Sequence, residues 1–106
     1  MVMTDEIRMI REKIIHAVPI EKLYLFGSYA NSTPNEYSDF DFYVVIPNDG
    51  LRPVEAVQSI FRSVRGMNRK PMDILAGTVE TFERRSKQIT LERTVANEGV
   101  LLYEKP

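Results

Sequence analysis

The chain has 106 residues, a formal net charge of −1 and no cysteine. Its length suits one domain, 1–106, and its 43% hydrophobic and 27% charged fractions are those of a globular protein. The near-neutral charge argues against direct nucleic-acid binding, and the lack of cysteine excludes disulfides and thiolate metal sites. Because no apolar run suits a membrane span or a signal peptide, we expect a cytoplasmic protein with no membrane partner.

The first half of the chain predicts one helix and two strands. Thr4 can cap the helix, whose apolar residues recur at three- and four-residue spacing until Pro19 ends it. The apolar run 23–26 predicts a buried strand, and the aromatic and β-branched run 40–46 predicts a second one. Since the polar stretch 31–37 is too short to hold a crossover helix, we expect these strands to be antiparallel.

The second half predicts two more strands separated by helices. Pro53 begins a second helix, and Gly66 lies just past its end, where a left-handed cap residue is common. The apolar stripe of this helix comprises Val54, Val57, Ile60, Phe61 and Val64. Residues 72–76 predict a third strand, Gly77 and Thr78 a turn and a helix cap, and 100–103 a last strand at a sheet edge.

A further helix follows Thr78, with Val79 and Phe82 on its apolar face. We expect a break between residues 86 and 90, after which Thr90 can cap a separate helical turn that Gly99 closes. The predicted order α-β-β-α-β-α-β indicates an α/β (α+β) fold of two layers, with helices mainly on one face of a mixed sheet.

Two aspartates separated by one residue begin the second predicted strand. Side chains alternate along a strand, so Asp39 and Asp41 should share one face while Phe40 and Phe42 point into the core. Two like charges held side by side favour a cation or a raised pKa. If the third strand is a neighbour, Asp73 joins them, and three carboxylates suit Mg²⁺ or Mn²⁺.

Gly27 and Ser28 directly follow the first predicted strand. Glycine allows close approach of the backbone, and the serine hydroxyl and the N–H groups of a following turn are donors for phosphate oxygens. Two divalent cations beside a triphosphate would suit in-line phosphoryl transfer, which requires positioning and charge neutralisation.

The spacing of these residues resembles the signature of the DNA polymerase β-like nucleotidyltransferase superfamily. Ten residues separate Ser28 from Asp39, and the signature is a Gly–Ser pair, such a spacer, an Asp-x-Asp pair and a third Asp on a later strand. The small size makes the chain most similar to the minimal nucleotidyltransferases, whose genes pair with genes of helical HEPN-domain proteins. The resemblance extends from the first predicted strand to the last.

This resemblance implies a reaction and a role for each of these residues. Gly27 and Ser28 would hold the triphosphate of ATP or another nucleoside triphosphate. Asp39, Asp41 and Asp73 would bind a pair of Mg²⁺ ions, with Mn²⁺ as a substitute, and Asp73 would also help to deprotonate the acceptor. The reaction would transfer a nucleoside monophosphate, commonly AMP, to a hydroxyl and release pyrophosphate. In antitoxin members the acceptor can be a tyrosine of the HEPN partner.

Other readings of the sequence stay open. Asp39 could cap a turn, and Asp73 could be a solvated acid at the start of a strand. A non-catalytic binding module could neutralise a partner by surface contact, and Asn31–Ser32, where many relatives have Arg–Gly, favours this alternative. A small-molecule nucleotidyltransferase of the antibiotic-modifying kind would need a deep acceptor pocket. The small size also predicts partner binding or a homo-oligomer.

Overall fold

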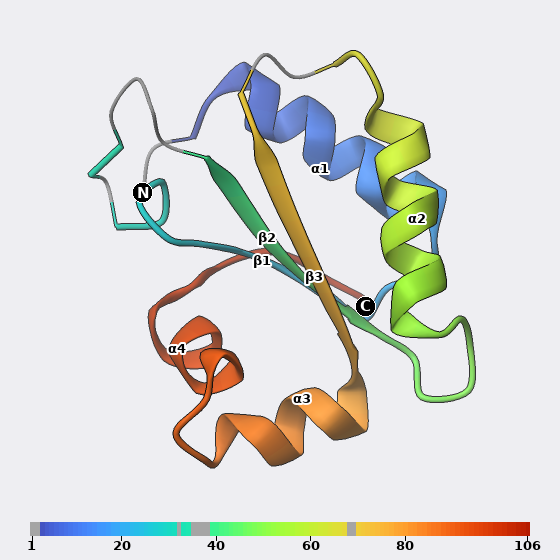
Figure 1. The fold of residues 1–106 in the computed structure, drawn as a ribbon, viewed down its shortest axis with the longest axis vertical. Helices are drawn as coiled ribbons and strands as arrows, with labels where there is room; N and C mark the ends of the chain where they lie inside the picture. The colour runs from blue at the N-terminus through green and yellow to red at the C-terminus, as the bar shows by residue number, and fades with distance from the viewer. Residues whose placement is uncertain (1–2, 32, 35–38, 68–69) are drawn as a thin grey trace.

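The computed structural model describes residues 3–31, 33–34, 39–67 and 70–106. Its elements are α1 (Asp5–Ala17), β1 (Lys22–Phe26), β2 (Phe40–Ile46), α2 (Pro53–Val64), β3 (Met72–Thr78), α3 (Val79–Ser86), α4 (Leu91–Glu98) and β4 (Val100–Glu104). The strands form one sheet in the order β3-β2-β1-β4 (Figure 1). β1 is antiparallel to β2 and β4, whereas β2 and β3 are parallel, so the sheet is mixed, as predicted.

Alternate residues of β2 face two separate hydrophobic clusters. Phe40 and Phe42 lie in the larger cluster, which packs against α1 and α2. Tyr43 lies in the smaller cluster on the opposite face, together with Phe82 of α3 and Val95 of α4. The predicted α/β class is therefore confirmed. The two long helices share one face of the sheet as expected, while the two short helices cover part of the other (Figure 1).

Threonine side chains fix where three of the helices begin. The hydroxyls of Thr4, Thr78 and Thr90 each accept a hydrogen bond from the backbone N–H three residues further on, at 3.1–3.2 Å. Each bond satisfies one of the N–H groups that a helix leaves without a partner at its first turn. Gly66 follows α2 with a φ of 79°. These caps, and the break between α3 and α4, agree with the sequence predictions.

The predicted apolar stripe of α2 is wrong in part. The helix buries Ala56, Ile60 and Val64, which follow one another at four-residue spacing. Val54 and Phe61, which the prediction placed in the stripe, are 54% and 42% exposed. Because helical residues are about 100° apart, these two side chains point away from the line of buried residues. Apolar character alone could not reveal that they face solvent.

Gly77 lies inside β3 and not in the predicted turn. The hydroxyl of Tyr43, on the neighbouring strand, packs directly against it, and a Cβ built at Gly77 would overlap that oxygen and lie 3.4 Å from Tyr43 Cζ. Glycine here therefore makes room for an aromatic side chain, so the strand continues through it until Thr78 begins α3.

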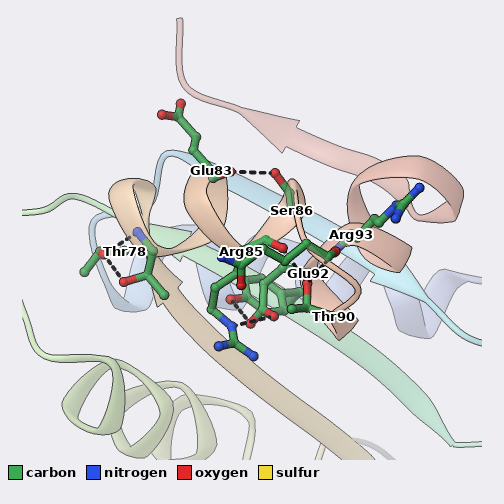
Figure 2. A network of polar contacts seen from close by, with 10 residues as sticks. Thr78, Glu83, Arg85, Ser86, Thr90, Glu92 and Arg93 are labelled. Atoms are coloured by element: carbon green, nitrogen blue, oxygen red, sulfur yellow. Dashed lines mark hydrogen bonds and ion pairs between the residues drawn. The ribbon is translucent and has the colours of Figure 1, made fainter.

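A polar network holds α3 and α4 to β2. Tyr43 Oη donates to Glu92 Oε2 at 2.9 Å, and Arg85 Nε donates to Glu92 Oε1 at 3.0 Å. Figure 2 shows Arg85 and Glu92 facing each other, with the Thr90 hydroxyl donating to the Arg85 carbonyl. Burial and the hydrogen bond to Glu92 raise the pKa of Tyr43. Burial acts to raise the pKa of Glu92, but hydrogen bonds from Arg85, the backbone and Tyr43 outweigh it and lower that pKa.

Among the described residues, no helix has the length and apolar character needed to cross a membrane. The loop predicted over residues 31–37 lies largely outside the described part of the chain.

Candidate active site

Asp41 is the second residue of β2, and it lies between two neighbouring strands. Its register partner on β1 is Phe26, and its register partner on the parallel strand β3 is Asp73. Residues in parallel register project their side chains to the same face, so Asp41 and Asp73 lie side by side on the face that also carries Tyr43. The structure therefore brings together two acids that are far apart in the sequence.

The electrostatics of Asp41 show how crowded this site is. The pKa of Asp41 is raised to about 6, first by burial and then by the charge of Asp73, a hydrogen bond with Asp73 and the charge of Asp39. Asp41 and Asp39 are partly buried, whereas Asp73 is exposed at the outer strand. Because two neighbouring acids act on the Asp41 carboxyl group, a positive charge beside Asp41, from a proton or a cation, is favoured.

Gly27 borders Asp41 on the β1 side. Its φ of 78° lies in the left-handed region, which suits glycine. A Cβ built at Gly27 would overlap Asp41 Oδ2 and would lie 3.3 Å from Asp41 Cγ. Any side chain here would therefore displace the carboxylate, so Gly27 serves both the turn after β1 and the position of Asp41.

Ser28 begins a short turn that the core holds in place. The N–H of Asn31 donates to the Gly27 carbonyl at 3.1 Å and closes the turn. Tyr29, the next residue after Ser28, is buried with its ring centroid 4.7 Å from that of Phe40. Since Phe40 lies one residue before Asp41, the same core contact fixes the turn and the start of β2. Gly27 and Ser28 are thus held at the β1 side of the acids.

The three acids only partly meet the needs of a metal ion. Within the described ranges, no group of three or more His, Cys, Asp or Glu side chains is arranged to hold one ion, so the expected three-carboxylate cage is not assembled there. Asp41 and Asp73 are in contact, whereas Asp39 acts on Asp41 through its charge. Mg²⁺ is commonly held by one or two carboxylates together with waters and substrate phosphates. The donor chemistry of the Asp41–Asp73 pair therefore fits Mg²⁺.

Leu75 is an exposed residue beside the acids that no sequence pattern singled out. This residue is the register partner of Tyr43 and lies two residues after Asp73, so it projects to the same face as the acids. It is 39% exposed, because α3 and α4 pack over Tyr43 and leave the outer strand uncovered. Alternation from Asp73 could have predicted its direction, but its exposure depends on where the helices pack.

Comparisons with known proteins identify the family of this chain. A family model described as a nucleotidyltransferase domain matches residues 7–97. No curated protein matches the chain. Several solved structures share its fold.

A candidate nucleotidyltransferase from Sulfolobus solfataricus is 19% identical, with a TM-score of 0.64 over 94% of this chain and 78% of its own. A toxin–antitoxin solved with AMP-PNP is 21% identical, with a TM-score of 0.62 over 96% of this chain and 75% of its own. A double mutant of the toxin–antitoxin MntA–HpeT is 18% identical, with a TM-score of 0.65 and the same two coverages. These likenesses establish the fold, and the family model spans most of the sequence. The chain therefore belongs to the nucleotidyltransferase domain family.

Proposed function

We propose that this protein transfers AMP from ATP to a hydroxyl group of a HEPN-domain toxin and so acts as its antitoxin. The observation that carries the proposal is the row formed by Gly27, just past the end of β1, Asp41 on β2 and Asp73 on β3. Membership of the nucleotidyltransferase domain family supports the reaction class. Two of the similar structures are toxin–antitoxin proteins, and one of these was solved with AMP-PNP, which supports the choice of partner and of nucleotide.

In this proposal each residue has a defined task. The Ser28 hydroxyl and the backbone around Gly27 would bind the triphosphate, while Asp39, Asp41 and Asp73 would hold Mg²⁺, for which Mn²⁺ could substitute. Mg²⁺ held by these carboxylates would supply positive charge that neutralises the triphosphate and lowers the pKa of the acceptor hydroxyl. A carboxylate oxygen of Asp73 takes the hydroxyl proton. The acceptor oxygen bonds to the α-phosphorus, the bond from that phosphorus to the bridging oxygen breaks, and pyrophosphate leaves with the electron pair.

The test is a labelling reaction with the product of the neighbouring gene. The protein is incubated with Mg²⁺, α-labelled ATP and that product, in which label should then appear. Chelation with EDTA should stop the transfer, and Mn²⁺ should restore it. Asp41→Asn and Asp39→Asn should lower the rate by at least about a hundredfold, since they remove cation ligands from a step that depends on charge neutralisation. Asp49→Asn, in the exposed loop after β2, is the matched control.

The main alternative is a binding module that neutralises the partner without catalysis. The absence of a three-acid group within the described residues is the observation that favours it. A neutralisation assay separates the two, because Asp41→Asn should abolish protection by an enzyme and leave protection by a binding module intact. Failure to label with any nucleoside triphosphate, with both variants equal to wild type, would defeat the enzymatic proposal. The proposed substrates, ATP and a toxin that acts inside the cell, agree with a cytoplasmic location.

A further inference from the structure

The order of the strands gives the two sides of the site different tasks. Gly27 and Ser28 lie at the end of β1, Asp41 on β2, and Asp73 on β3, which is the last strand of the sheet on that side. If the triphosphate binds at Gly27 and Ser28, the leaving pyrophosphate departs on the β1 side. In-line transfer requires the attacking oxygen to be opposite the leaving oxygen. The acceptor must then approach over β3.

Leu75 is an exposed apolar side chain two residues from Asp73 on the same face of β3. Two residues of a strand span about 7 Å, so Leu75 lies one side-chain repeat from Asp73 on the same face. Its neighbour Tyr43 is covered by Phe82, with ring centroids 5.1 Å apart, whereas Leu75 is 39% exposed. An exposed leucine beside a carboxylate provides an apolar surface next to the point where the acceptor hydroxyl must be held.

We propose that Leu75 is a specificity-determining residue that contacts the body of the acceptor. The inference rests on the proposed function and specifies its substrate class. The acceptor hydroxyl is carried by an apolar or aromatic group that packs on Leu75 while Asp73 takes the hydroxyl proton. A polyol or sugar hydroxyl would leave this contact unused and would bind more weakly. The bonds formed and broken are those of the transfer described above.

The chain offers a matched control for this residue. Leu101 is 43% exposed and lies on β4, the strand at the opposite edge of the sheet. Threonine is β-branched, a shape that strands favour, so Leu75→Thr and Leu101→Thr should both fold. The probes are 2-phenylethanol, an alcohol with an apolar body, and glycerol, a polar alcohol.

The first readout is binding, followed by NMR of the ¹⁵N-labelled protein with Mg²⁺ and a non-hydrolysable ATP analogue. With 2-phenylethanol, the amides of 73–77 should shift and saturate. Leu75→Thr should weaken this binding about five- to tenfold, as expected for the loss of a partly buried leucine contact, whereas Leu101→Thr should change it less than twofold. Shifts that avoid β3, equal effects of the two variants, or equal binding of glycerol would overturn the inference.

The second readout is pyrophosphate release from ATP with 2-phenylethanol as the acceptor. Leu75→Thr should raise the KM for this acceptor by the same factor and leave the KM for ATP and the kcat unchanged, which a general structural defect would not do. If no variant releases pyrophosphate with any acceptor, the proposed function fails. If wild type releases it and Leu75→Thr has the same acceptor KM, this inference alone fails.

Discussion

Replacing Asp41 with asparagine should stabilise the metal-free protein while it removes activity. The pKa of Asp41 rises from 3.8 to about 6, chiefly through burial and the neighbouring Asp73. A pKa that is higher by about 2 in the folded state corresponds to about 3 kcal/mol in the free energy of unfolding, at about 1.36 kcal/mol per pKa unit. Since solvent reaches part of this carboxyl group and screens its interactions, we expect about 1–2 kcal/mol. The asparagine amide can donate to Asp73, as the protonated Asp41 carboxyl does.

The sign of the pH dependence follows from the same pKa. Asp41 binds its proton more tightly in the folded than in the unfolded chain, so the folded state holds more protons between about pH 4 and 6. The contribution of Asp41 to the free energy of unfolding should therefore fall as pH rises through that window and stay low above it. In Asp41→Asn this part of the pH dependence should disappear.

Urea denaturation from pH 4 to 8, with EDTA, measures both effects. Mg²⁺ should then raise the stability of wild type at pH 7, because a ligand that binds only the folded state stabilises it, and should do little for Asp41→Asn. Asp49→Asn, in an exposed loop, should follow wild type in every condition. An Asp41→Asn protein less stable than wild type at pH 7 in EDTA would refute the reasoning, since the charge of Asp41 would then have a favourable partner.

Three further substitutions test other parts of the structure by urea denaturation. Gly27→Ala and Gly66→Ala place a Cβ at almost the same positive φ, but only at Gly27 does it overlap a neighbouring carboxylate, so Gly27→Ala should cost at least about 1 kcal/mol more; equal losses would count against that contact. Tyr43→Phe should cost about 1 kcal/mol through the lost hydrogen bond to α4, and no loss would mean that the bond contributes little. Ile60→Ala should cost about 2–5 kcal/mol and Phe61→Ala much less, whereas equal losses would agree with the predicted stripe of α2, which contained both residues.

Local signals predicted most of the fold. Threonine caps, Pro53 and the positive-φ Gly66 depend on neighbours in the sequence, and the helices begin and end where those residues predict. β2 matches its predicted range, 40–46, because its residues favour strands and its flanking stretches do not. The features that were missed depend on contacts from distant segments. Gly77 was placed in a turn because no local pattern reveals that a tyrosine of another strand packs on it.

For the candidate site too, local patterns predicted some features, and the others depend on contacts between distant segments. Strand alternation placed Asp39 and Asp41 on one face, but the position of Asp73 was conditional on which strands are neighbours. The observed register shows that β2 and β3 are neighbours and pairs Asp41 with Asp73. The neighbouring Asp73 raises the pKa of Asp41. The contact between Gly27 and the Asp41 carboxylate could not be predicted from the sequence. It depends on the register between β1 and β2, which the sequence of the loop between them does not reveal. The roles of these residues in binding metal and triphosphate stay predictions.

Asp73 also affects how copies of this chain behave toward each other in solution. β3 is at an edge of the sheet, where backbone groups can pair with a strand of another molecule. The exposed side chain of Leu75 adds an apolar surface that favours such association. A charged side chain on an edge strand opposes such joining by electrostatic repulsion. Variants that neutralise Asp73 to abolish transfer are therefore expected to aggregate more readily at high concentration. Their loss of activity should be read only alongside light scattering of the same samples.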